Sequence, residues 1–185
     1  MDFKVIETEY KGYRFRSRLE ARWAVFFDAC GVKWEYEPDG YKLGDGVLYL
    51  PDFLLHDITV YKLELQKHCD VYVEVKGDMR EGDSLKIEAF SASKPILVVS
   101  KIPDGKTIWE LVDSMKYLSN EMNPPPFNFA TIDRDFFGAY PAIDKQLGFG
   151  LYGDDVQYLS NLDEGKTVDA YNAARMARFE HGEKG

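Results

Sequence analysis

The chain is poor in the residues that build disulfide frameworks and soft-metal sites. Its 185 residues include two cysteines, Cys30 and Cys69, and three histidines, His56, His68 and His181. Neither set has the spacing of a zinc site, and two isolated thiols are typical of a reduced, cytoplasm-like compartment. The composition therefore disfavours both a disulfide-stapled scaffold and a zinc enzyme.

Long apolar runs and several common catalytic motifs are also missing. No stretch of about 18 apolar residues occurs, and the first residues lack the apolar core of a signal peptide. We therefore expect a cytoplasmic protein with no membrane partner. The chain has no nucleophile elbow for serine hydrolysis and no P-loop for nucleotide phosphates.

Basic residues are outnumbered by acidic ones. Lysine and arginine total 23 against 32 aspartates and glutamates, a formal net charge of −9. Proteins that coat nucleic acid are usually basic, because phosphate contacts dominate their affinity. The balance argues against tight non-specific binding of nucleic acid over the whole surface, although a local basic groove is compatible with an acidic remainder.

The pattern of apolar residues predicts an α/β domain, and 45% hydrophobic residues suffice for a sizeable core. The predicted helices span residues 17–30, 83–93, 108–122 and 168–179. The predicted strands span residues 33–37, 41–43, 47–55, 71–76 and 95–100. Residues 56–70 show no clean period and are interpreted as a loop or small insertion. Residues 127–165 are aromatic and glycine-rich, with weak periodicity. We expect a core over 1–122 and a C-terminal extension over 123–185 that packs on it.

Four residues carry the chemical signal: Glu20, Asp52, Glu74 and Lys76. Glu74 and Lys76 are two apart on an apolar strand, so they project from the same face. Asp52 and Glu74 can offer carboxylates at one point, and the backbone carbonyl of Val75 is a candidate third ligand. Oxygen donors suit Mg²⁺ or Mn²⁺. Lys76 then lies beside the metal, where it can orient water or stabilise developing charge.

Each of these residues also has a plain structural interpretation. Glu20 follows Ser17 by three residues and fits the N3 position of a capping box. Asp52 is compatible with an ordinary turn or strand edge. Glu74 and Lys76 are compatible with a same-face ion pair, which contributes little when exposed. Two charges inside an apolar strand nevertheless favour a functional role.

The combination of Pro51-Asp52 with Glu74-Val75-Lys76, preceded by the helix glutamate Glu20, resembles the PD-(D/E)XK nuclease superfamily. The resemblance covers roughly residues 10–100. It implies a restriction-endonuclease-like core, in which helices flank a central mixed β-sheet. It also implies Mg²⁺- or Mn²⁺-dependent hydrolysis of DNA, leaving 5′-phosphate and 3′-hydroxyl ends. Asp52, Glu74 and Lys76 would be catalytic, and Glu20 would complete the metal shell.

Several segments are more narrowly similar to nucleases encoded by phages and mobile elements. They are residues 13–28, 34–38, 49–53 and 173–182. This similarity implies a phage or mobile-element role and a location in the host cytoplasm. Residues 56–70 and 127–185 have no counterpart in the superfamily core.

A set of basic residues supplies candidate phosphate contacts. Its members are Lys11, Arg14, Arg16, Arg18, Arg22 and Lys86. The first five precede or open the helix that carries Glu20. Cations there oppose the helix dipole, which mildly favours phosphate binding over a solvated helix start with local salt bridges.

The sequence predicts a metal-dependent DNA endonuclease or exonuclease and leaves two alternatives open. One is a DNA- or protein-binding module that keeps the nuclease fold without cutting. The other is an enzyme that applies the same metal chemistry to RNA or nucleotides. DNA is the expected partner, and a homodimer is compatible with two-strand cleavage, which requires two sites.

Overall fold

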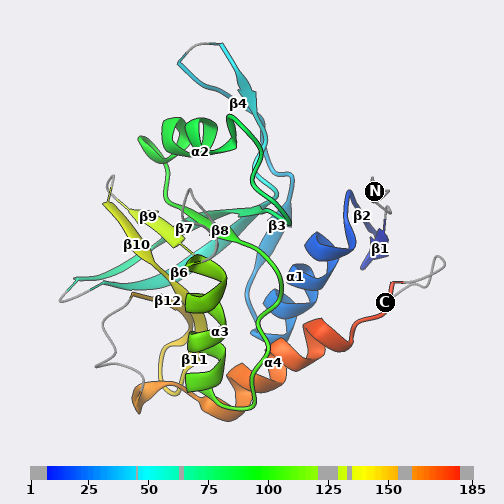
Figure 1. Ribbon diagram of the computed structural model, residues 1–185, viewed down its shortest axis with the longest axis vertical. Helices are drawn as coiled ribbons and strands as arrows, with labels where there is room; N and C mark the ends of the chain where they lie inside the picture. The colour runs from blue at the N-terminus through cyan, green and yellow to red at the C-terminus, as the bar shows by residue number, and fades with distance from the viewer. Residues whose placement is uncertain are drawn as a thin grey trace.

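The computed structural model describes residues 8–44, 46–62, 65–120, 129–132, 135–153 and 160–179. It is an α/β structure in which a curled, mixed β-sheet is flanked by helices (Figure 1). The helices are α1 (Arg18–Ala29), α2 (Asp83–Ser91), α3 (Ile108–Asn120) and α4 (Glu164–Met176). None of these described helices is both long and apolar enough to cross a membrane.

The strands form one large sheet and two small hairpins. They are β1 (Thr8–Tyr10), β2 (Tyr13–Phe15), β3 (Trp34–Tyr36), β4 (Tyr41–Lys42), β5 (Leu48–Tyr49), β6 (Phe53–Lys62), β7 (Leu65–Val75), β8 (Ile96–Val99), β9 (Phe129–Ile132), β10 (Asp135–Gly138), β11 (Tyr140–Asp144) and β12 (Gly148–Tyr152). The large sheet has the order β10-β9-β8-β7-β6-β12-β11, with β3 paired to β6. Hairpins β1–β2 and β4–β5 stand outside it.

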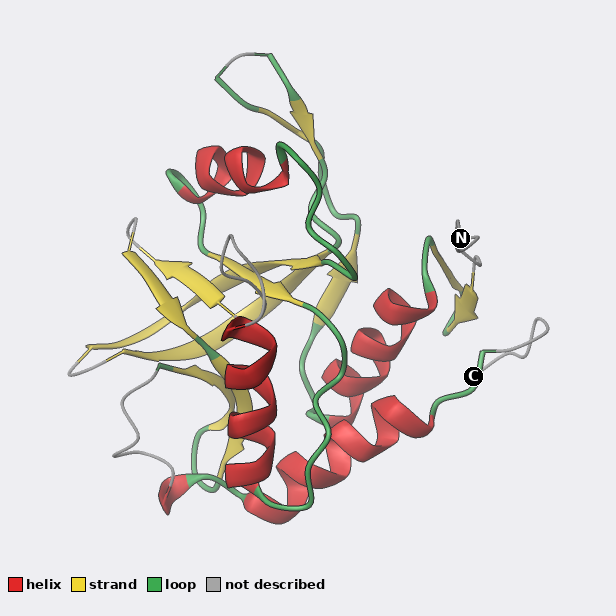
Figure 2. Ribbon diagram, in the orientation of Figure 1, coloured by secondary structure: helices red, strands yellow, loops and turns green. Residues whose placement is uncertain are grey.

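The two faces of the sheet have different cover. Alternate residues of β7 face opposite sides, so Val71, Val73 and Val75 join the core under α1, α3 and α4. Tyr72 joins a second cluster with α2 and the β4–β5 hairpin. Figure 2 shows α2 on the side of the sheet away from the other helices. Because Glu74 follows the same alternation as Tyr72, β7 directs it toward the α2 side.

The predicted succession of strand 71–76, helix 83–93 and strand 95–100 is typical of a parallel crossover, and the structure has one. β7 and β8 pair in parallel and are joined through α2. All four residues of β8 are buried, as expected for a strand covered on both faces. The crossover places the carboxyl ends of both strands at one edge, where Lys76 follows β7 and its N–H donates to Val99 O at 2.8 Å.

The prediction of a loop or insertion over residues 56–70 is wrong. β6 continues to Lys62, and β7 begins at Leu65. The two strands pair antiparallel, with a register shift between Leu55 and Ile58 where Asp57 has a φ of +54°. This bulge turns both Leu55 and Ile58 into the core, three positions apart, and so breaks the two-residue period that marks a strand.

The described residues after 129 extend the same sheet at both sides. β9 pairs with β8 and continues to β10, whereas β12 pairs in parallel with β6 and continues to β11. The β12–β6 pairing depends on Gly150, where a Cβ would lie 2.8 Å from Thr59 O. Weak periodicity concealed these strands, which are short, and two of them, β10 and β12, contain glycine. The expected boundary at residue 123 lies outside the described residues.

Helix α4 begins and ends earlier than the predicted range of 168–179. Asp163 caps it by accepting a hydrogen bond from the Lys166 N–H at 3.1 Å, a start signal that the apolar pattern alone did not mark. α4 packs against α1, with Phe26 and Tyr171 stacked at 4.2 Å between ring centroids. The C-terminal helix is thereby joined to the helix that carries Glu20.

Tyr171 also ties α4 to the sheet, because its buried hydroxyl donates to Pro141 O at 2.7 Å. We expect Tyr171→Phe to lower the free energy of unfolding by about 1–2 kcal/mol, since it removes a buried hydrogen bond and keeps the ring. Urea denaturation measures this loss, with the exposed Tyr13→Phe as the control. Equal stability of the two variants would show that the hydroxyl does not anchor α4.

Candidate active site

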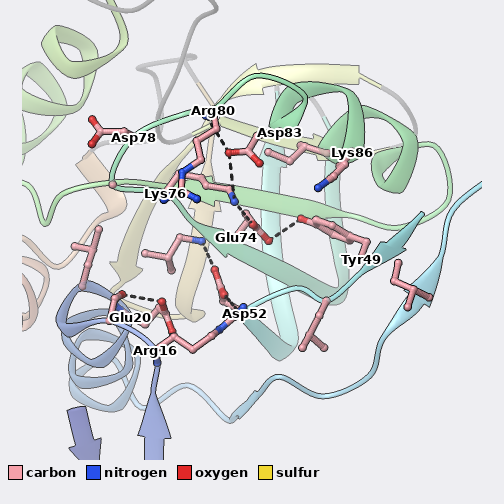
Figure 3. Close-up of a pocket in the computed structure, with 17 residues that line it drawn as sticks. Arg16, Glu20, Tyr49, Asp52, Glu74, Lys76, Asp78, Arg80, Asp83 and Lys86 are labelled. Atoms are coloured by element: carbon pink, nitrogen blue, oxygen red, sulfur yellow. Dashed lines mark hydrogen bonds and ion pairs between the residues drawn. The ribbon is translucent and has the colours of Figure 1, made fainter. Parts of the chain in front are cut away.

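A cleft of about 810 Å³ contains all four residues of the predicted site. It lies where the start of α1 meets the end of β7, the β4–β5 hairpin and α2 (Figure 3). Its charged and hydroxyl-bearing walls are formed by Arg16, Ser17, Glu20, Tyr49, Asp52, Glu74, Lys76, Asp78, Arg80, Asp83 and Lys86. The structure therefore brings together side chains that are separated by up to 70 residues in the chain.

Asp52 is held by the pairing of β6 with β7. Its N–H donates to Val73 O at 3.0 Å, one residue before β6 begins. Its Oδ2 accepts a hydrogen bond of 2.7 Å from the Val75 N–H, and its Oδ1 lies 2.8 Å from Arg16 Nη2. The carboxylate is thus fixed beside the end of β7, with only 5% of the residue exposed.

Glu74 and Lys76 project to the same face, as predicted. Glu74 Oε1 lies 2.7 Å from Lys76 Nζ, and Glu74 Oε2 accepts a hydrogen bond of 2.7 Å from the Tyr49 hydroxyl. Lys76 Nζ is also 3.6 Å from Asp83 Oδ2 at the start of α2. The same-face ion pair between Glu74 and Lys76 that we considered as a purely structural alternative is present. Its glutamate is buried, however, and the pair faces the cleft.

Glu20 lines the cleft and also stabilises the start of α1. Ser17 Oγ accepts the Glu20 N–H at 3.2 Å, which caps the helix, and donates to Glu20 Oε1 at 2.7 Å. Glu20 Oε2 accepts the Tyr36 hydroxyl at 2.6 Å and the Arg16 N–H at 3.2 Å. The two interpretations of Glu20 are therefore compatible, since its capping role holds the carboxylate at the cleft.

The clustered carboxylates perturb one another. Burial, then the charge of Glu74 and then that of Glu20, raise the pKa of Asp52 to about 8, against the opposite effects of the Val75 N–H and Arg16. Burial by itself lowers the pKa of Lys76, but Glu74, together with Asp83 and Asp52, outweighs it and raises that pKa above its ordinary value. The site thus holds an excess of negative charge beside a lysine that stays protonated.

Of the six predicted phosphate-binding residues, Arg16 and Lys86 line the cleft. Lys11 instead pairs with Asp28, with Nζ and Oδ2 3.0 Å apart. The other three, Arg14, Arg18 and Arg22, are also not among the residues that line it. The hairpin β1–β2 and the turn into α1 place these four side chains away from the cleft.

Sequence reasoning missed four charged or hydroxyl-bearing residues of the cleft, Tyr49, Asp78, Arg80 and Asp83. In β5, Leu48 is exposed and the next residue, Tyr49, is buried. The alternation of side chains in the strand just before Pro51 was the sequence signal that could have identified Tyr49. Arg80 precedes α2, where its N–H donates to Asp83 Oδ2 at 3.0 Å. Arg80 belongs to no pattern that the sequence alone singles out.

The donor set of the cleft fits a hard divalent cation. Among the described residues, no three His, Cys, Asp or Glu side chains are grouped as a complete metal site. Two carboxylates are present, however, and the Val75 carbonyl points to the same edge of β7 as the Val75 N–H that bonds Asp52. Mg²⁺ commonly binds through one or two carboxylates and keeps several waters. The mutual repulsion of the carboxylates further favours a cation there.

The arrangement of these groups carries the functional inference, because comparisons of the chain with protein-family models, curated proteins and solved structures give no match.

Proposed function

We propose that this protein is a nuclease that hydrolyses phosphodiester bonds of DNA with Mg²⁺ or Mn²⁺, as an endonuclease or exonuclease. The observation that carries the proposal lies where the start of β6 runs beside the end of β7. There two buried carboxylates, Asp52 and Glu74, lie beside a protonated lysine in an open cleft. Groups of this kind are typical of metal-assisted phosphoryl chemistry.

The charge of the cleft supports a role for a cation. Five described carboxylates line it, Glu20, Asp52, Glu74, Asp78 and Asp83, against four cationic side chains, Arg16, Lys76, Arg80 and Lys86. With all five carboxylates ionised, the formal balance is 4 − 5 = −1, which disfavours an anionic phosphodiester. One bound divalent cation would reverse that sign, and so would make the cleft attractive to the substrate.

Asp52, Glu74 and the Val75 carbonyl would hold the cation. Glu20 lies at the edge of the site, where it accepts hydrogen bonds from Ser17, Tyr36 and Arg16. When bound, the cation supplies a nucleophilic water at neutral pH and neutralises phosphate charge. Lys76 acts as a cation and hydrogen-bond donor, because its raised pKa excludes a role as general base near neutral pH. Its Nζ orients water and stabilises the negative charge that develops on phosphorus-bound oxygens. Tyr49 keeps Glu74 in place.

The element order supports a restriction-endonuclease-like core. α1, β3, β6, β7, α2 and β8 follow in the order α-β-β-β-α-β that the superfamily resemblance implies, with the β4–β5 hairpin added before β6. We extend the proposal to a phage or mobile-element origin, from the same resemblance. A homodimer would allow two such sites to cut both strands of a duplex.

The second candidate is a binding module that retains the site without cutting. It is favoured by the ion pairs that already occupy the carboxylates and by the net charge of −9. Such a module has no need of a cation at Asp52 and Glu74. Metal binding at these residues therefore separates the two candidates.

Incubation with supercoiled, linear, single-stranded and branched DNA, with Mg²⁺, Mn²⁺ or EDTA, tests the proposal. We expect metal-dependent cutting that falls by about 10²–10³-fold in Lys76→Met, which removes one preorganised cation from the developing charge. Lys101→Met is the matched control, since it removes an exposed lysine outside the cleft. If the folded wild-type protein cuts none of these substrates with either metal, the binding module becomes the better description.

A further inference from the structure

Each of the two central carboxylates is bound by two donor groups of this chain, and each oxygen keeps one lone pair. Each of their four oxygens accepts one bond or ion pair. The donors are Arg16 Nη2 and the Val75 N–H to Asp52, and the Tyr49 hydroxyl and Lys76 Nζ to Glu74. A divalent cation that binds Asp52 Oδ1 would share that oxygen with the Arg16 guanidinium, whose positive charge opposes the cation.

Arg16 is the donor with the greatest freedom to leave. Its side chain is 56% exposed, against 23% for that of Lys76. The Tyr49 ring is buried against α2, and the Val75 N–H is fixed by the strand that contains it. The guanidinium therefore covers the solvent side of Asp52, whereas the other three donors are part of the packed wall.

Arg16 also has a second acceptor close by. Its Nε lies 2.7 Å from Glu37 Oε1. Glu37 has a φ of +46°, a left-handed conformation that is costly for a residue with a side chain, and its N–H donates to Asp52 O at 2.8 Å. The backbone strain at Glu37 is thus maintained at the point where its carboxylate holds Arg16. If Arg16 moves away from Asp52, its guanidinium can therefore stay paired with Glu37.

We propose that Arg16 is a displaceable counter-ion of the site. It competes with a divalent cation for Asp52 and stays paired with Glu37 when the cation binds. The inference rests on the proposed function and adds a positioning role for Arg16 and Glu37. The guanidinium N–H groups released from Asp52 then face the cleft, where phosphate oxygens can accept them. Cation binding and substrate binding are coupled through this one side chain.

The test measures the affinity of the full chain for Mn²⁺, from the EPR signal of the free ion and without substrate. We expect Arg16→Met to bind Mn²⁺ about tenfold more tightly than the wild type, because loss of the competing charge-assisted bond frees Asp52. Lys86→Met is the matched control: it removes one positive charge from the same cleft, and Lys86 bonds to neither carboxylate. The Mn²⁺ affinity of Lys86→Met should stay within about twofold of that of the wild type, because solvent and salt screen the exposed Lys86 charge.

A double-mutant cycle separates displacement from a general charge effect. Glu37→Gln removes the negative charge of the second acceptor, so Arg16 leaves Asp52 less readily, and Mn²⁺ should bind about threefold more weakly. In the Arg16→Met background the same substitution should have no effect. A general loss of negative charge would instead weaken Mn²⁺ binding equally in both backgrounds, which contradicts the proposal.

The outcomes distinguish this inference from the proposed function. Mn²⁺ binding that is abolished by Glu74→Gln but is unchanged or weaker in Arg16→Met overturns the role of Arg16 and leaves the metal site intact. Absence of Mn²⁺ binding in every variant, or binding that survives Glu74→Gln, overturns the metal site itself and the inference with it. Circular dichroism of each variant confirms that the comparison is between folded proteins.

Discussion

Glu74→Gln is expected to lower Mg²⁺-dependent cleavage by about 10³-fold or more while the protein stays folded, because it removes one of the two carboxylates that we propose as ligands of the cation. The local structure tolerates the amide. Its oxygen can keep the contact with Lys76, and its NH₂ group can donate to the Tyr49 hydroxyl, which accepts as readily as it donates. The loss of activity then reports chemistry and not unfolding.

Single-turnover cleavage of the preferred DNA measures this effect, with Glu88→Gln as the control on the exposed surface of α2. Thermal denaturation of both variants in EDTA shows whether they are folded. A Glu74→Gln protein that cuts at more than about a tenth of the wild-type rate would be inconsistent with Glu74 as a metal ligand, since loss of a ligand costs far more.

The metal-free protein is expected to lose stability as the pH rises from about 4 to about 8, and Mg²⁺ is expected to restore it. The pKa of Asp52 is raised from its ordinary value of 3.8 to about 8, first by burial and then by Glu74. Across that interval the folded state keeps a proton that the unfolded chain has released. The contribution of Asp52 is therefore full below about pH 4 and lost above about pH 8, with a slope of at most about 1.4 kcal/mol per pH unit.

Urea denaturation in EDTA between about pH 5 and pH 8 measures this slope in the wild type and in Glu74→Gln. The slope should be shallower in Glu74→Gln, because the neutral amide no longer raises the pKa of Asp52. Near pH 8, Mg²⁺ at about 100 times its dissociation constant should stabilise the wild type by about 2.7 kcal/mol and the variant by much less. Equal pH slopes of the two proteins in EDTA would show that the Glu74 carboxylate does not raise the pKa of Asp52.

Local patterns in the sequence were sufficient for the strongly periodic elements. The capping box at Ser17 and Glu20 marked the start of α1, and the apolar runs marked β7 and β8 with the parallel pairing between them. The two-residue spacing of Glu74 and Lys76 placed them on one face, which the structure confirms. These signals depend on neighbours along the chain, so no knowledge of distant contacts was required.

Non-local contacts decided the features that the sequence concealed. The bulge at Asp57 broke the period of β6, so a strand was predicted as a loop. The strands β9 to β12 are stabilised by their pairing to the two sides of one sheet, and their own residues carry a weak pattern. Basic residues near α1 seemed equivalent in sequence, yet only Arg16 among them reaches the cleft.

By itself, the sequence determined the residue types of the candidate site and the strand that presents Glu74 and Lys76. Only the tertiary structure decided how those residues meet: the register of β6 on β7 sets Asp52 against the Val75 N–H, and the β4–β5 hairpin brings Tyr49 to Glu74. The ion pairs of Arg16 with Glu37 and Asp52 likewise close the site with its own counter-ion. Side-chain spacing within a strand is fixed by backbone geometry, whereas contacts between strands and hairpins depend on how the whole chain packs.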